Sequence, residues 1–275
     1  MQLVERGRAV LSDPVAEYLP EFAQDGKEGV TLWHLVTHTS GLEEPASKQI
    51  CELFDRREPV STFLEIAYRA GLSFKPGTRW SYSGLTFTVL GELITQISGQ
   101  PYPEFMREHI FAPLAMTDTS FAPQLERLAP VNMFRSHEDF TYFNTLATPA
   151  GGLYSTSDDL VRFGRTFLNK GKLEDVRLLS EGTVTTMTRV HTEGIMATES
   201  GKQRPAYAGL GWGMRSPYGN VLGSERAYGH AGASGSWLWI DPEWNLVFAL
   251  LSNSEGSKPS TPIRMLNAVY GALER

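Results

Sequence analysis

The stretch GHAGASGSWLWIDPEWNLVFALLSN, residues 229–253, decides the fold. It contains two runs rich in aromatic and β-branched residues, 234–240 and 245–252, separated by an Asp-Pro turn. A shorter run of the same kind, 226–230, comes directly before them. Strands joined by connections this short pair antiparallel. The segment therefore predicts an antiparallel sheet.

The residues on either side extend this sheet unit. A further strand is predicted over 207–215, and the helical pattern over 261–273 is expected to cover one face of the sheet. Alternate residues of a strand share a face, so Trp237 and Trp239 point the same way. They could line a substrate pocket, but packing against a helix is the favoured interpretation.

Upstream of this unit the sequence is mainly helical. Apolar residues recur at helical spacing between Pro and Gly residues, and a stretch with Lys, Gly and Ser over 196–204 is expected to be a loop. Ser157 is the predicted N-cap of one helix, which has two aspartates in its first turn. The expected helices cover residues 31–37, 60–70, 84–98, 103–110 and 157–169.

Together these patterns predict an α+β fold within one domain, residues 1–275. A mainly helical lobe, 1–205, is followed by antiparallel strands and a closing helix, 206–275. The opening residues, MQLVERG, have the pattern of the last turns of an amphipathic helix that ends near Gly7. An isolated helix this short is marginal in water. Either residues are missing upstream, so that the chain begins inside a helix, or packing alone holds this segment.

Composition excludes several classes of function. The net charge of −6 and the lack of a clustered Lys/Arg stripe give no footprint for nucleic acid or anionic membranes. Cys51 is the one cysteine, which excludes an intramolecular disulfide and a thiolate-rich metal site. No apolar run approaches the roughly 20 residues that span a bilayer. A chain starting at Met1 is expected in the cytoplasm, and an upstream export signal would direct it elsewhere.

Five segments along the chain occur in a recognisable order. They resemble, in order and spacing, the signature blocks of β-lactamase-related serine hydrolases, a family that includes class C β-lactamases, D-alanyl-D-alanine carboxypeptidases, carboxylesterases and acyltransferases. The resemblance implies a helical lobe with an antiparallel sheet flanked by helices, acyl-serine chemistry on a small ester or amide substrate, and no metal or organic cofactor. The segments are LWHLVTHTSGL (32–42), PGTRWSYSG (76–84), FAPLAMTDTSF (111–121), PAGGLYSTSDDL (149–160) and the segment 229–253.

The first motif that the resemblance implies, Ser-x-x-Lys, is not found in residues 1–275. None of the seven lysines has a serine three positions before it. In relatives this motif lies on a helix that ends in a segment like LVERG, so its place is just upstream of Met1. We therefore expect an N-terminal truncation that removes the nucleophile helix and the first strands, and little or no turnover by this chain, because residues that act as a unit fail together.

The second motif, Tyr-x-Asn in the family, matches Tyr82-Ser83-Gly84. The resemblance makes Tyr82 a catalytic proton shuttle. A phenol with a pKa near 10 acts as a base at neutral pH only beside stabilising cations. The alternative is that Tyr82 is a core aromatic residue. Gly84 lacks the family's amide, which argues against a strictly β-lactam-directed site.

The third motif, Lys-Thr-Gly or His-Thr-Gly in the family, matches His230-Ala231-Gly232. By resemblance these residues bind substrate, and the N–H of Ala233 donates to the oxyanion. Gly232 lets substrate approach the backbone. Ala231 offers no hydroxyl to a substrate carboxylate, and His230 is only partly charged at neutral pH. The motif therefore favours neutral esters.

Two alternatives stand beside this interpretation. His34 and His38 have the spacing of a zinc pair, but no Glu occupies the metalloprotease position, which favours structural roles at a helix end. The chain could also be a pseudoenzyme that binds a ligand or partner, as the missing Ser-x-x-Lys suggests. Against this, loss of the first strands would expose a sheet edge.

Overall fold

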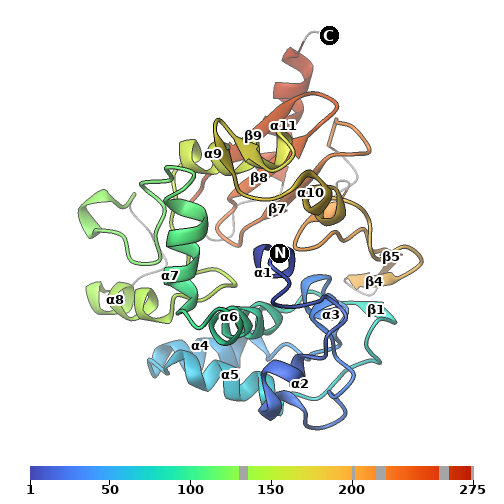
Figure 1. Cartoon of the computed structure of the whole chain (residues 1–275). Coiled ribbons are helices and arrows are strands. Elements are labelled where there is room, and N and C mark those ends of the chain that lie inside the picture. Colours follow the sequence, from blue (N-terminus) through green and yellow to red (C-terminus); the bar gives the residue numbers. More distant parts are fainter. Residues whose placement is uncertain (130–135, 200–201, 215–220, 254–259, 274–275) are drawn as a thin grey trace.

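The computed structural model describes residues 1–129, 136–199, 202–214, 221–253 and 260–273. A helical lobe and an antiparallel sheet with its own helices lie on opposite sides of the N-terminus (Figure 1). The predicted α+β fold is confirmed. In the described residues, no helix is long and apolar enough to cross a bilayer.

The main sheet has the strand order β6-β7-β8-β9, with every neighbouring pair antiparallel. Its three longer strands match the predicted runs, although β7 and β8 each end one residue later than predicted. The strand predicted over 207–215 is wrong over most of its described length, because Gly211 takes a left-handed φ of 76° and turns the chain. The strands are β6 (Gly213–Met214), β7 (Tyr228–Ala231), β8 (Trp237–Asp241) and β9 (Leu246–Leu250).

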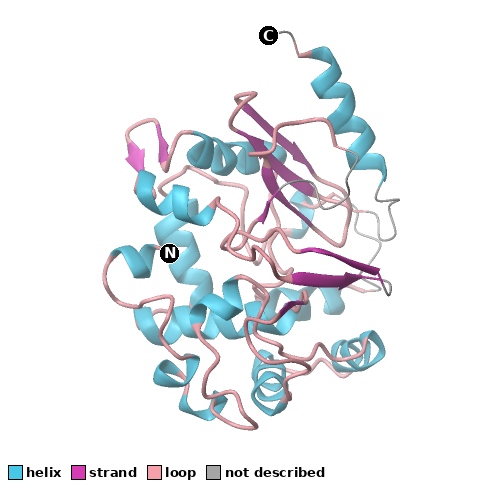
Figure 2. Cartoon of the chain, turned by 90° about the vertical axis from the view of Figure 1, so that its right-hand side faces the viewer, coloured by secondary structure: helices cyan, strands magenta, loops and turns pink. Residues whose placement is uncertain are grey.

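Helices cover both faces of this sheet (Figure 2). Trp237 and Trp239 share a buried cluster with residues of α11 (Ser260–Ala272), so the predicted packing of these tryptophans on a helix is confirmed. Leu238 points to the opposite face, where α9 (Ser157–Leu168) packs. The alternation of β8 therefore determines where both helices lie.

The N-cap of helix α9 lies one residue earlier than predicted, and the helix packs closely on the sheet. Its N-cap is Thr156, whose hydroxyl accepts from the N–H of Asp159 at 3.3 Å, and Ser157 is the first helical residue. Thr and Ser have the same capping chemistry, so the sequence did not separate them. A Cβ on Gly164 would lie 2.6 Å from Cγ1 of Val247 on β9, which leaves no room for a side chain.

We expect Gly164→Val to lower the free energy of unfolding by about 1–3 kcal/mol, because it overpacks the interface between α9 and β9. The matched control is Gly182→Val in α10 (Glu181–Met187), where the nearest atom to a new Cβ is 3.9 Å away. Urea denaturation followed by circular dichroism gives both values. Equal stabilities for the two variants would contradict the close packing.

The helical lobe is built around α6 (Gly84–Ser98). Leu85, Val89, Leu93 and Ile97, spaced by four residues, form one buried stripe of this helix in the core of the lobe. The predicted helices are confirmed with small shifts at their ends. They are α3 (Leu32–Val36), α5 (Val60–Arg69), α6, and α7 (Tyr102–Met106) with its continuation Arg107–Phe111.

Several short elements were not predicted. Met196–Glu199 and Lys202–Pro205 (β4 and β5) pair antiparallel, so the loop predicted over 196–204 is wrong; residues 200 and 201 lie outside the described part. Strand β1 (Arg79–Trp80) pairs with β4 in parallel. The others are α2 (Val15–Tyr18), Pro20–Phe22, α4 (Ser47–Asp55), Leu125–Arg127, α8 (His137–Leu146), β2 (Lys172–Leu173), β3 (Val176–Arg177) and α10.

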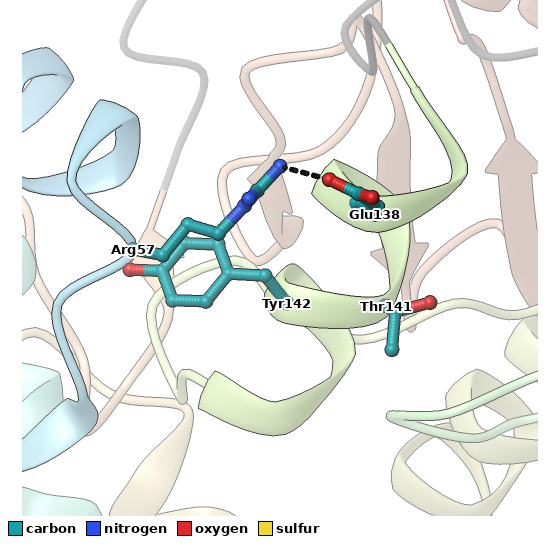
Figure 3. Close-up of a pocket in the computed structure, with 4 residues that line it drawn as sticks. All are labelled: Arg57, Glu138, Thr141 and Tyr142. Carbon is teal, nitrogen blue, oxygen red and sulfur yellow. Dashed lines mark hydrogen bonds and ion pairs between the residues drawn. The ribbon is translucent and has the colours of Figure 1, made fainter.

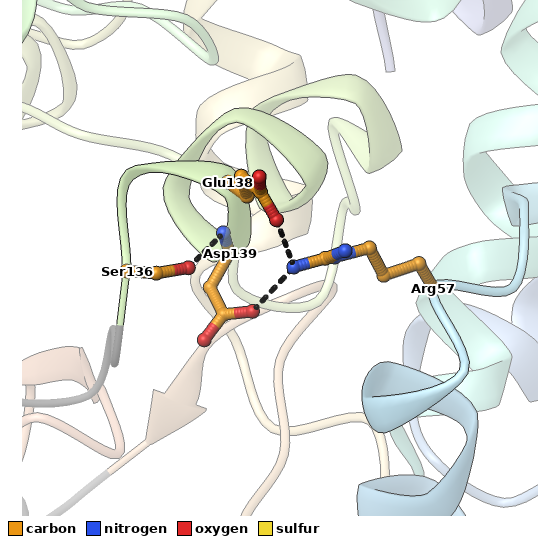
Figure 4. A network of polar contacts seen from close by, with 4 residues as sticks. All are labelled: Arg57, Ser136, Glu138 and Asp139. Atoms are coloured by element: carbon orange, nitrogen blue, oxygen red, sulfur yellow. Dashed lines mark hydrogen bonds and ion pairs between the residues drawn. The ribbon is translucent and has the colours of Figure 1, made fainter.

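Helix α8 is joined to the end of α4 by charge and aromatic contacts. The guanidinium of Arg57 lies 3.0 Å from the carboxylate of Glu138 and 3.3 Å from that of Asp139 (Figure 4). A depression of about 450 Å³ between them is lined by Arg57, Glu138, Thr141 and Tyr142 (Figure 3). Its one cation is thus paired with two carboxylates, and this depression lies apart from the predicted site residues.

Helix α1 (Gln2–Glu5) lies between the level of the helical lobe and that of the sheet (Figure 1). Leu3 is buried in the core of the helical lobe. The side-chain amide of Gln2 donates to the carbonyls of His109 at 2.9 Å and Leu178 at 3.3 Å. These tertiary contacts hold a helix that is too short to be stable alone.

Candidate active site

A cavity of about 1320 Å³ lies between the helical lobe and the sheet. All five predicted site residues line it: Tyr82, His230, Ala231, Gly232 and Ala233. The fold therefore brings together two segments that are far apart in sequence. The chemical role of each residue stays a prediction.

Tyr82 directly precedes the N-cap of α6, and its side chain is 48% exposed. That exposure does not fit a core aromatic residue. The centroid of its ring is 6.3 Å from that of His230 and 4.6 Å from that of His38. The ring of Tyr82 at the cavity wall therefore lies close to two imidazoles.

The two histidines of the possible zinc pair have different roles. Nδ1 of His34 accepts from the N–H of Thr31 at 3.0 Å and completes the N-terminal cap of α3, a structural role as predicted. His38 instead packs against Tyr82, which sequence reasoning missed. The signal available was its place in the segment 32–42. Within the described ranges no three His, Cys, Asp or Glu residues cluster as metal ligands.

The imidazoles near Tyr82 favour their neutral forms. Burial, and then the charge of His230, lower the pKa of His38 to about 4. Partial desolvation in the cavity lowers the pKa of His230, although the residue as a whole is exposed, and a hydrogen bond with the carbonyl of Ala231 opposes this shift. Desolvation, and then the carboxylate of Glu44, raise the pKa of Tyr82. The phenol is therefore protonated at neutral pH, and acting as a base would require an added cation.

A carboxylate lies beside Gly84, the last residue of the Tyr82-Ser83-Gly84 motif. Glu44 accepts from the hydroxyl of Ser83 at 2.5 Å and from the N–H of Leu85 at 3.3 Å, at the start of α6. Its second oxygen would lie 3.2 Å from a Cβ on Gly84. Glycine therefore leaves space beside this carboxylate. No sequence signal pointed to Glu44, because it is distant from the motif along the chain.

The turn between β7 and β8 forms the other side of the site. The N–H of Gly232 donates to the carbonyl of Ser236 at 2.7 Å, and the N–H of Gly235 donates to the carbonyl of Gly232 at 3.0 Å. Ala233 lies in this turn rather than at the edge of a strand. A Cβ on Gly232 would meet its nearest neighbour at 3.7 Å, an ordinary contact, so folding alone does not require glycine there.

Comparison with known proteins identifies the family to which this chain belongs. The sequence profile of the family described as Beta-lactamase matches residues 1–271. The chain belongs to the β-lactamase family. The match covers nearly the whole chain of this β-lactamase-family protein. It therefore includes both sides of the cavity, one formed by Tyr82 and the other by the β7–β8 turn.

The relatives of this β-lactamase-family protein are described by different functions. A putative D-alanyl-D-alanine carboxypeptidase of Escherichia coli K12 is 26% identical over 302 residues, 95% of this chain and 66% of its own length. A penicillin-binding protein homolog from Caulobacter crescentus has a TM-score of 0.79 at 20% identity, over 99% of this chain and 79% of that one. A family VIII carboxylesterase has a TM-score of 0.78 at 20% identity, over 98% and 79%. The two structures support the fold alone, and this chain spans 66% of the curated relative.

We expect the stability of the protein to fall as pH drops from about 6.5 toward 4. The pKa of His38 is about 4 in the folded protein, against 6.5 for a histidine in an unstructured peptide, which represents the unfolded chain. The unfolded state therefore takes up a proton first, which costs on the order of 3 kcal/mol of stability. Urea denaturation at pH 7.5 and 4.5 measures this loss.

His38→Phe is the control for this titration, because it removes the ionisable group and keeps a ring. Its stability should fall less across the same interval than that of the wild type. An identical fall would show that His38 is not held neutral by burial.

Proposed function

We propose that this chain is part of a serine hydrolase that cleaves ester or amide bonds through an acyl-serine intermediate, with carboxylesterase activity favoured. The convergence of Tyr82 and the β7–β8 turn on one cavity carries this proposal. Activity, substrate and the nucleophile segment are all part of the proposal, because the chain spans 66% of its curated relative.

The proposed steps follow from the chemistry of these groups. The serine oxygen attacks the carbonyl carbon and loses its proton through Tyr82 and the family's lysine. The N–H of Ala233 donates to the developing oxyanion. Tyr82 then passes a proton to the leaving alkoxide or amine. Water attacks the acyl-serine by the reverse proton route, which releases the acid and restores the serine.

The nucleophile is proposed to come from a segment upstream of Met1. Residues 1–275 contain no Ser-x-x-Lys. Met1, Leu3 and Val4 line the same cavity as Tyr82, so a preceding segment would enter it directly. Its lysine would supply the cation that the phenol of Tyr82 needs in order to lose its proton.

Neutral esters are the proposed substrates. The carboxylate of Glu44, whose charge helps to raise the pKa of Tyr82, opposes an anionic substrate at the tyrosine, and the lowered pKa values of His38 and His230 leave those rings uncharged at neutral pH. Ala231 offers no hydroxyl. A substrate carboxylate would therefore meet repulsion without the hydrogen bonds that usually offset it.

For residues 1–275 alone we expect little or no hydrolysis of p-nitrophenyl butyrate. A longer native chain carrying Ser-x-x-Lys should hydrolyse this ester, and more slowly nitrocefin. Tyr82→Phe in that longer chain should lower kcat by about 100-fold or more, because it removes the proton shuttle. Intact-mass and N-terminal analysis of the native protein establishes which chain to assay.

Two results would contradict this proposal. Saturable esterase activity of residues 1–275 that Tyr82→Phe abolishes would remove the need for an upstream nucleophile. Faster hydrolysis of nitrocefin than of p-nitrophenyl butyrate by the longer chain would reverse the substrate preference.

The second candidate is a non-catalytic protein that binds a ligand in the same cavity. The observation that favours it is the lack of Ser-x-x-Lys in residues 1–275. A native chain that starts at Met1 would select this candidate.

A further inference from the structure

His38 holds both backbone positions that flank Tyr82. It directly follows the C-cap of α3 and has a left-handed φ of 55°. Its carbonyl accepts from the N–H of Ser81 at 3.0 Å, and its Nδ1 accepts from the N–H of Ser83 at 3.3 Å. One residue thus fixes the chain on each side of the tyrosine.

The ring of His38 also supports the ring of Tyr82. The two planes are inclined by 34° with centroids 4.6 Å apart. Phe87 of α6 lies 5.1 Å from the imidazole, and Trp80 meets it edge-on at 5.8 Å. His38 is 7% exposed, so the position of its ring is set by packing on several sides.

The hydrogen bond at Nδ1 requires one form of the imidazole. An N–H can donate to Nδ1 only when that nitrogen carries no proton, so the ring is neutral with its proton on Nε2. Burial lowers the pKa of His38 and favours the same form. A residue that only filled space would need no acceptor at this place.

We propose that His38 is a positioning residue for Tyr82: its Nδ1 accepts from the N–H of Ser83 and so holds the tyrosine, whose ring packs beside the imidazole, in its catalytic orientation. This proposal rests on the proposed function, since the orientation matters only if Tyr82 transfers protons. His38 acts through Tyr82 and the chain beside it.

The variants separate the acceptor from the ring. His38→Asn keeps an acceptor oxygen near the place of Nδ1, and asparagine tolerates a left-handed φ. His38→Phe keeps the ring and removes the acceptor. His34→Ala is the matched control, because it removes a histidine that caps α3 and makes no ring contact with Tyr82 among those described.

The first measurement is ¹⁹F NMR of 3-fluorotyrosine-labelled residues 1–275, with the Tyr82 resonance assigned by its loss in Tyr82→Phe. We expect one sharp Tyr82 resonance in the wild type, His34→Ala and His38→Asn. In His38→Phe this resonance should broaden or split. An unchanged resonance in a folded His38→Phe protein would overturn the acceptor's role, whatever the activity.

Should His38→Phe fail to fold, His38→Gln replaces it, because its amide reaches toward the Nε2 position and leaves Nδ1 without a substitute. The same contrast with His38→Asn then applies. Equal Tyr82 resonances in the Asn and Gln variants would overturn the proposal.

The second measurement is ester hydrolysis by the longer native chain. His38→Phe should lower kcat by about 10- to 100-fold with little change in KM, since misplacement of a reacting group lowers the rate of the chemical step. His38→Asn should recover most of that loss. An inactive wild type with the expected NMR contrast would reject the proposed function while keeping the effect of His38 on Tyr82.

Discussion

The indole N–H of Trp239 donates to the hydroxyl of Tyr270 at 2.9 Å, and that hydroxyl donates to the carboxylate of Asp241 at 2.7 Å. This buried chain of hydrogen bonds joins α11 to β8 at one relative position. Leaving any one of these buried groups without its partner would lower the free energy of unfolding by about 1–3 kcal/mol. With α11 on one face and α9 on the other, β8 cannot slip by one residue, because a slip would exchange its two faces.

The register of β8 determines the position of the site. Gly229 pairs with Trp239, and Ala231 pairs with Trp237, so the turn that follows β7 is placed by tryptophans buried under α11. Asp241 also accepts from the hydroxyl of Ser224 at 2.6 Å, which ties the segment before β7 to the end of β8. The geometry of the candidate site therefore depends on the packing of Trp237 and Trp239 against α11, and Trp237 also lines the cavity.

The sequence predicted the parts of this protein whose signals are local. Strands β7 to β9 follow from residue alternation, and α6 from its apolar stripe at a spacing of four. Helix α8 is held by partners distant in sequence, such as Arg57 and Phe54. The pattern of apolar residues within 137–146 was therefore not enough to predict it. Strand β6 was shortened by the left-handed Gly211, a backbone choice that a strand-like composition does not reveal.

The site divides in the same way. Tyr82 and residues 230–233 were found through motifs. Glu44 and His38 were missed as site residues, because each reaches Tyr82 or α6 through the folded chain rather than through sequence proximity. The pairing of β1 with β4 adds a further link: Arg79 lies opposite Met196, and Trp80 opposite Ala197, just before Tyr82. The backbone that leads into Tyr82 is therefore tied to β4 as well as to His38, so a displacement of β4 would also displace the tyrosine.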